Sequence, residues 1–179
     1  MKITMAAALT IRPATMDDAV HLAEIWNTEA VTTLNTTDTE ARDAAAQRAW
    51  LASHSPTYPV IVAVADDDVA GYAALKRYRE GKPAFDRTVE DSVYVHTAWR
   101  GRGVGRLLLA HLVDTARALG HHSVLARITA ENVASRRLHE ALGFRLLGVE
   151  EAVAFKLGRW LDVAVYQRRL TPLRRSDAR

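Results

Sequence analysis

Hydrophobic residues recur at intervals of three and four positions in four stretches of the chain, which is the spacing of helices with one buried face. Thr15 stands three residues before Asp18 in a helix-capping pattern, and Asn132 is placed to cap a later helix. Gly120 and Gly143 are typical stop residues. We therefore expect helices over residues 17–30, from 38 or 39 to 55, 107–119 and 133–142.

Alternating or continuous apolar runs between these stretches are typical of strands. In the run 88–96, Glu90, Ser92 and Tyr94 share one face, and the other face is mostly valine. An acidic turn at 66–68 predicts a hairpin. We expect strands over residues 9–11, 59–65, 69–75, 88–96, 124–128, 144–150 and 161–170.

Early antiparallel hairpins followed by strand–helix–strand–helix alternation predict one domain of the mixed α/β class. The 179 residues are 49% hydrophobic and 25% charged, which is enough to bury one core and excludes a disordered chain. We expect a single domain over residues 8–170 and a basic C-terminal tail over residues 171–179.

The formal net charge is +3, which by itself would suggest a nucleic-acid partner. Residues 168–179 hold five arginines and one aspartate, so the remaining 167 residues carry a net charge of −1. We also expect no gathering of the four tryptophans with arginines into a stacking surface. The charge therefore predicts no nucleic-acid partner.

Cysteine is absent, which excludes disulfides, cysteine-based zinc sites and a thiolate nucleophile. We expect no metal. Apolar runs are too short for a signal peptide or a membrane span. These observations predict a cytoplasmic protein with no membrane partner.

Three glycines alternate with other residues between an expected strand and an expected helix, at Gly101, Gly103 and Gly105. Such a loop directs several backbone N–H groups toward an anion at the positive end of the helix. Arg100, Arg102 and Arg106 add guanidinium groups that match phosphate oxygens. The segment therefore predicts a pyrophosphate site, although a flexible turn with solvated arginines is the plainer alternative.

Residues 100–105 and 132–144, in this order, resemble the two coenzyme A segments of the GCN5-related N-acetyltransferases (GNAT). The resemblance implies the GNAT fold, a mixed and mostly antiparallel sheet flanked by helices, with acetyl-CoA as cosubstrate. It implies that loop amides hold the pyrophosphate and that Val93 and Val95 pair with the pantetheine arm. The implied cofactor residues are Val93, Tyr94, Val95, Arg100, Gly101, Arg102, Gly103, Val104, Gly105, Arg106, Asn132 and Ser135.

Residues 88–95, 138–143 and 155–163 are similar to a narrower subgroup, the phosphinothricin and methionine sulfoximine N-acetyltransferases. This likeness implies an acyltransferase that acetylates small amino acids with a tetrahedral polar head, and a homodimer with the pocket near the subunit boundary. Thr36 and Leu109 depart from the subgroup, at positions where its members commonly or sometimes carry an aromatic residue. Both departures could reshape the acceptor pocket.

Acetyl transfer to an amine needs the amine neutral, and a free amine with a pKa of about 8 to 10 is mostly protonated at pH 7. Glu90 is the candidate general base, because partial burial in an apolar strand raises a carboxyl pKa. In the resembled subgroup, the matching Glu is the proposed general base. His139, which is also a histidine in the subgroup, is the candidate proton donor to the departing coenzyme A thiolate. Alternatively, it only orients a group in the pocket. A backbone N–H near Val95 is expected to stabilise the oxyanion. Without cysteine, direct attack in a ternary complex is favoured.

The acceptor carboxylate needs a cation, and Arg79, Arg87 and Lys156 are the candidates implied by the resemblance. A peptide N-terminus or a polyamine is the alternative acceptor. A non-catalytic acetyl-CoA sensor is the alternative outside enzymes.

Overall fold

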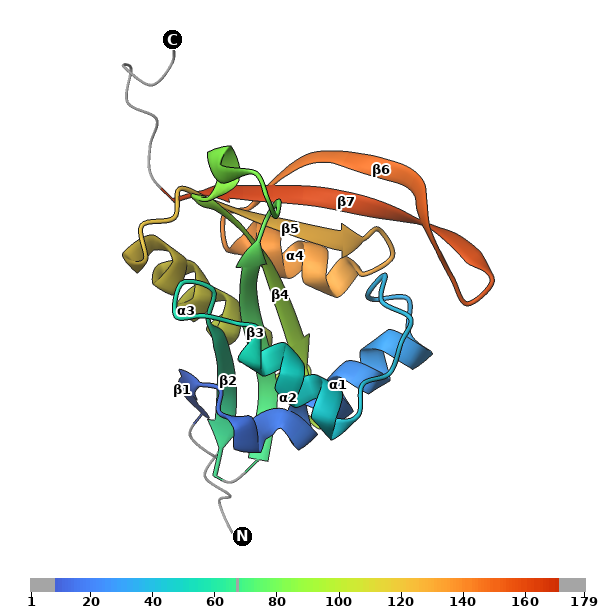
Figure 1. Ribbon diagram of the computed structural model, residues 1–179. Coiled ribbons are helices and arrows are strands. Elements are labelled where there is room, and N and C mark those ends of the chain that lie inside the picture. Colours follow the sequence, from blue (N-terminus) through green and yellow to red (C-terminus); the bar gives the residue numbers. More distant parts are fainter. Residues whose placement is uncertain (1–8, 67, 171–179) are drawn as a thin grey trace, which may run out of the picture.

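In the part of the chain that the structure describes, seven strands form one sheet in the order β1-β2-β3-β4-β5-β7-β6 (Figure 1). This computed structural model describes residues 9–66 and 68–170. All strand pairs are antiparallel except β4 with β5, so the expected mixed and mostly antiparallel sheet is confirmed. The strands are β1 (Leu9–Pro13), β2 (Val60–Ala65), β3 (Asp68–Arg77), β4 (Thr88–Val95), β5 (Ser123–Thr129), β6 (Arg145–Lys156) and β7 (Arg159–Arg169).

Among the described residues, four α-helices lie on the two faces of this sheet. They are α1 (Ala19–Thr32), α2 (Ala44–Ala52), α3 (Val104–Ala118) and α4 (Val133–Ala141). The α3 helix packs its leucines against β2, β3 and β4 in the larger core, and α4 lies beside it. The α1 and α2 helices pack on the other face, over a smaller core around Tyr72. The central strands β2, β3 and β4 therefore lie between two helical layers.

The second helix begins later than the sequence predicts. Its N-cap is Asp43, whose Oδ1 accepts a hydrogen bond from Ala46 N (2.7 Å), and residues 33–43 form a loop before it. Within this loop the Thr36 hydroxyl bonds Asp38 Oδ2 (2.7 Å), the local side-chain bonding that competes with helix formation. The start expected at residue 38 or 39 is therefore wrong.

The last hairpin is longer than predicted. The β6 strand continues to Lys156, and the β6–β7 ribbon extends beyond the other strands (Figure 1). Its register shifts between Glu150 and Ala154, where Ala152 has a positive φ of 48°. This irregularity interrupts the alternation on which the sequence prediction depended. The expected C-terminal tail, residues 171–179, and residue 8 lie outside the described residues.

None of the helices in the described ranges is long and apolar enough to cross a membrane. Over the same ranges, no three His, Asp or Glu side chains are grouped so that they could hold a metal ion.

Candidate active site

The β4 and β5 strands separate part of the way along their length. They pair only from Thr88 to Glu90, opposite Ser123 to Leu125, although β4 continues to Val95. His96 N donates to Ala70 O of β3 (3.0 Å). Because peptide groups alternate in direction along a strand, the N–H and C=O groups of Val93 and Val95 point away from β3, into the gap. An extended ligand could pair with this edge as an additional strand.

The glycine loop lies at the end of this gap. Gly101 and Gly103 have φ values of 74° and 83°, which favour glycine, and Gly103 is the N-cap of α3. The N–H groups of the first helical turn have no acceptor within the helix and can bind an anion. At Gly105 a Cβ would lie 3.2 Å from Leu138 Cδ2, so glycine allows α3 and α4 to approach each other. These features fit the predicted pyrophosphate site.

A groove of about 600 Å³ joins the loop and the strand gap. It brings together all but one of the predicted cofactor residues, and Arg102 is the exception. The residues that line it include Val93, Tyr94, Val95, Arg100, Gly101, Gly103, Val104, Gly105, Arg106, Asn132 and Ser135. Arg102 lies over the Trp99 ring instead, 5.1 Å from its centroid. The groove and its donors suit a long ligand with a pyrophosphate, such as coenzyme A.

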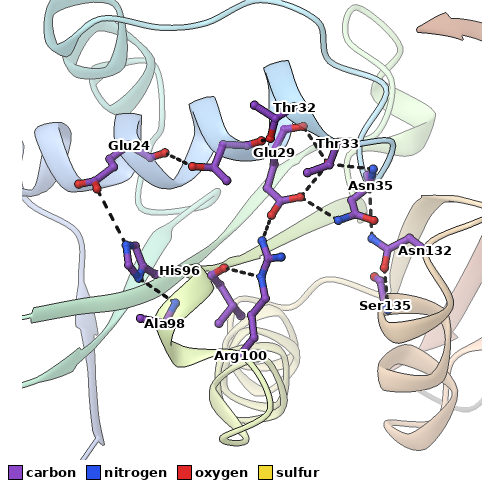
Figure 2. A network of polar contacts seen from close by, with 12 residues as sticks. Glu24, Glu29, Thr32, Thr33, Asn35, His96, Ala98, Arg100, Asn132 and Ser135 are labelled. Carbon is purple, nitrogen blue, oxygen red and sulfur yellow. Dashed lines mark hydrogen bonds and ion pairs between the residues drawn. The ribbon is translucent and has the colours of Figure 1, made fainter. Parts of the chain in front are cut away.

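Arg100 turns away from the loop and pairs with Glu29 of α1, which is buried (Figure 2). Glu29 also accepts hydrogen bonds from the Thr33 hydroxyl and from Asn35 Nδ2, both 3.0 Å long. Asn132 Nδ2 in turn donates to Asn35 O (3.3 Å). This network connects α1, the end of β4 and the start of α4 across the groove, so Arg100 holds the walls of the groove together.

The start of α4 is fixed by Asn132. Its Oδ1 accepts a hydrogen bond from Ser135 N (3.1 Å), as expected of the N-cap predicted from the sequence. Asn132 and Ser135 line the groove and also a second cavity beside it.

This second cavity, of about 690 Å³, lies between β4, β5 and the loop 33–43. It shares Asn35, Val93, Tyr94, Asn132 and Ser135 with the groove, so the two spaces meet there. Its other lining residues include Thr36, Asp38, Arg42, Lys76, Glu90, Asp91, Ser92 and His139. The arrangement provides room for two ligands whose ends meet beside β4.

Glu90 lines the second cavity and is buried. Its Oε1 lies 2.8 Å from Lys76 Nζ of β3, in an ion pair whose lysine is exposed and whose carboxylate is not. Lys76 was not singled out from the sequence, because only the β3–β4 pairing places it opposite Glu90. The pair fixes the carboxylate at the edge of the cavity.

His139 and Asp91 form a second, fully buried pair. His139 Nε2 lies 3.1 Å from Asp91 Oδ2, and His139 Nδ1 lies 2.8 Å from Ser135 O. Both partners are acceptors, so both ring nitrogens carry a proton and the imidazole is charged. Burial opposes this charge, but the Asp91 carboxylate and the two hydrogen bonds outweigh it and raise the pKa of His139.

The His139 pair predicts a pH dependence of stability. Because the folded-state pKa exceeds the unfolded value of about 6.5, the stabilisation is complete below that pH and is lost as the pH rises through the folded-state pKa. Urea unfolding between pH 6 and 9 should show a falling free energy of unfolding, and a variant lacking the imidazole, His139→Gln, should lose this slope. The exposed His111→Gln is the control. An unchanged slope in His139→Gln would contradict the assignment.

The three predicted substrate cations do not line the second cavity. Arg79 is exposed and stacks on Tyr78 and Phe85, and the Arg87 guanidinium donates to Gly120 O at 3.0 and 3.2 Å. Lys156 is buried and donates to Glu29 O (3.2 Å) and Thr36 O (2.9 Å), which ties β6 to the loop after α1. Burial lowers the pKa of Lys156, and the carboxylates of Asp38 and Glu29 oppose this effect.

Sequence reasoning missed Arg42. Its guanidinium lies 3.6 Å from the Trp26 ring centroid and 5.4 Å from that of Trp50, a contact between distant residues that no pattern along the chain indicates. Of the two departures from the subgroup pattern, Thr36 lines the second cavity, whereas Leu109 is buried in the core.

A long groove that ends at a glycine loop and joins a polar cavity with a buried carboxylate suits the transfer of a group between two substrates. The chain belongs to the acetyltransferase (GNAT) family, whose model matches residues 20–144. It is an N-acetyltransferase.

Its relatives make the family assignment more specific. The chain is 39% identical over 176 residues to an L-methionine sulfoximine/L-methionine sulfone acetyltransferase of Salmonella typhimurium, a match that covers 95% of this chain and 99% of the relative. A phosphinothricin acetyltransferase from Sinorhizobium meliloti, solved with acetyl-CoA, superposes with a TM-score of 0.86 at 35% identity and covers 90% of this chain and 88% of its own. A ribosomal-protein-alanine N-acetyltransferase from Brucella melitensis superposes with a TM-score of 0.87 at 37% identity. This match covers 90% of the present chain and 99% of the Brucella chain.

Proposed function

We propose that this protein acetylates the amino group of a small amino acid of the phosphinothricin, methionine sulfoximine or methionine sulfone type, with acetyl-CoA as donor. The observation that carries the proposal is the meeting of the two cavities beside β4, with the buried Glu90 carboxylate lining the second cavity. A ternary complex with direct attack by the amine fits this arrangement, since both ligands would have their own space.

The donor would occupy the groove. When bound, acetyl-CoA supplies an acyl thioester as the electrophile. The amides of the glycine loop and the first turn of α3 would hold its pyrophosphate, while the outward peptide groups of Val93 and Val95 would align the pantetheine arm. An N–H near Val95 would also stabilise the oxyanion that forms on the carbonyl.

Glu90 would act as general base. It would accept the proton of the acceptor ammonium, directly or through a water, and so allow the neutral amine to attack. The Lys76 ion pair would hold the carboxylate in place before the acceptor arrives.

His139 remains a proposed site residue, and its contacts favour an orienting role over proton donation. Both ring nitrogens already donate to Asp91 and Ser135. The pair would fix β4 beside Glu90 and the start of α4 beside the groove. Arg79, Arg87 and Lys156 remain proposals for acceptor binding, but none of them lines the second cavity, and Lys156 would act only through the loop that it holds.

A screen for thiol release from acetyl-CoA tests this function. We expect activity with methionine sulfone, methionine sulfoximine and phosphinothricin, and much less with polyamines. The absence of thiol release with every amine would favour an acetyl-CoA sensor instead.

A protein N-terminus is the second candidate acceptor, because the Brucella structure is named for that activity. Competition between an alanine-starting peptide and methionine sulfone decides between the two. A peptide acetylated with the higher kcat/KM would overturn the amino-acid proposal.

We further propose a homodimer formed through the β6–β7 ribbon. Large apolar side chains on this ribbon are exposed: Leu146, Leu147, Val149, Val153, Phe155, Leu157 and Trp160. Phe155 and Trp160 are 58% and 64% exposed and contact each other edge to face at 5.3 Å. Exposed apolar side chains gathered on one hairpin are typical of a protein interface.

Light scattering after size exclusion should give the dimer mass for the wild type, and Trp160→Asp should shift the protein toward the monomer. Val20→Asp, an exposed valine of α1, is the control. A wild-type monomer at micromolar concentration would contradict the dimer.

A further inference from the structure

Arg42 is held in a defined position although it lies in a loop. Asn27 of α1 bonds its backbone twice, with Asn27 Oδ1 accepting from Arg42 N (2.7 Å) and Asn27 Nδ2 donating to Arg42 O (2.8 Å). The guanidinium lies over the Trp26 ring and near the Trp50 ring, at centroid distances of 3.6 and 5.4 Å. Loop and side chain are therefore both fixed before any ligand binds.

The two tryptophans belong to a continuous aromatic wall. Trp26 contacts Tyr94 at 5.5 Å, Tyr94 stacks on Tyr72 at 5.1 Å, and Tyr72 contacts Trp50 at 6.0 Å. The rings come from α1, β4, β3 and α2, so they rigidly connect the helical layer with the sheet. Arg42 contacts both ends of this wall.

The other basic groups that line the same cavity already have partners within the protein. Lys76 pairs with Glu90, Arg127 with Glu150 and His139 with Asp91, whereas the His54 ring bonds Trp50 O through Nδ1 (2.8 Å). They are therefore poorer candidates than Arg42 for binding a further anion.

Arg42 differs from them. Within residues 9–66 and 68–170, its guanidinium forms no ion pair, and its one side-chain hydrogen bond, to Gln47 Oε1, is 3.4 Å long. Asp38 lines the same cavity, but its Oδ2 accepts from the Thr36 hydroxyl instead. A guanidinium stacked on a ring keeps its N–H groups in its own plane, available to an acceptor at its edge.

We propose that Arg42, held against Trp26 and Trp50, binds the α-carboxylate of the acceptor amino acid. This inference rests on the proposed function and names the residue that selects amino acids over simple amines. A carboxylate matches the guanidinium fork with two parallel hydrogen bonds. Because the amine and the carboxylate are bonded to the same carbon, the amine would lie next to the carboxylate held by Arg42 and would pass its proton to Glu90 directly or through a water.

The test compares two acceptors that differ only in the carboxylate, L-methionine sulfone and 3-(methylsulfonyl)propylamine. Calorimetric binding in the presence of coenzyme A and kcat/KM for acetyl transfer are both measured. For Arg42→Gln we expect the dissociation constant of methionine sulfone to rise about 10- to 100-fold, as for loss of a hydrogen bond to a charged group. The value for 3-(methylsulfonyl)propylamine should stay nearly constant. Arg42→Lys keeps the positive charge but not the planar guanidinium. Its dissociation constant for methionine sulfone should therefore lie between those of the wild type and Arg42→Gln.

The matched control is Arg77→Gln. Arg77 also lies over a ring, 5.5 Å from the Tyr58 centroid, but it lines neither cavity. It should change binding of neither acceptor. Equal losses with both acceptors in Arg42→Gln and Arg42→Lys would show a purely structural role and overturn the proposal, as would unchanged binding of methionine sulfone. Binding of methionine sulfone that depends on Arg42 without acetyl transfer would overturn the proposed function and leave this site standing.

Discussion

Glu90→Gln should lower kcat for acetylation of methionine sulfone about 10²- to 10⁴-fold, the usual contribution of a general base, and leave acetyl-CoA binding unchanged. The glutamine keeps the shape of the side chain but cannot accept a proton. Glu90 lies outside the lining of the cofactor groove, which is why donor binding should persist.

The pH profile separates the base from a binding role. The loss of kcat in Glu90→Gln relative to the wild type should become smaller as the pH rises above about 8, because more of the free acceptor is then already deprotonated. A binding role would give a deficit independent of pH. Glu24→Gln is the control, since Glu24 is 66% exposed on α1, outside both cavities. Normal kcat in Glu90→Gln would remove Glu90 from the mechanism.

Asp91→Ala should destabilise the protein by about 3–5 kcal/mol, the cost of leaving one member of a buried ion pair without its partner. The His139 and Asp91 side chains are only 4% and 2% exposed, so water cannot replace the lost carboxylate. Urea unfolding at pH 6 measures the effect.

Asp91→Asn tests whether charge or packing is responsible. Its amide can donate to a neutral His139 Nε2, so we expect a smaller loss of unfolding free energy than in Asp91→Ala. The wild-type decline in stability above pH 6.5 should disappear, because the histidine no longer gains from being charged. Asp114→Ala, in an exposed ion pair with Arg117, should leave stability nearly unchanged. A wild-type pH slope in Asp91→Asn would refute the charged pair.

Much of the fold and of the proposed cofactor groove could be predicted, because their signals are local. Glycines at 101, 103 and 105 and the Asn132 cap act through backbone conformation and neighbouring N–H groups, which a short segment encodes. The start of α2 could not be predicted, because Asp38 and Asp43 are both capable N-caps. Asn27 of α1 decides between them by holding the backbone of Arg42 in the loop.

The sequence by itself determined the α/β class, the family, the glycine loop before α3 and the face of β4 that carries Glu90, because each depends on residues adjacent in the chain. The tertiary structure alone decided which charges are paired. Lys76 meets Glu90, Asp91 meets His139, and Arg100 meets Glu29 through contacts between different elements. It also placed Arg42 between two tryptophans. Ion pairs and cation–π contacts act over a few ångströms, and no periodicity along the chain records which distant side chains come that close.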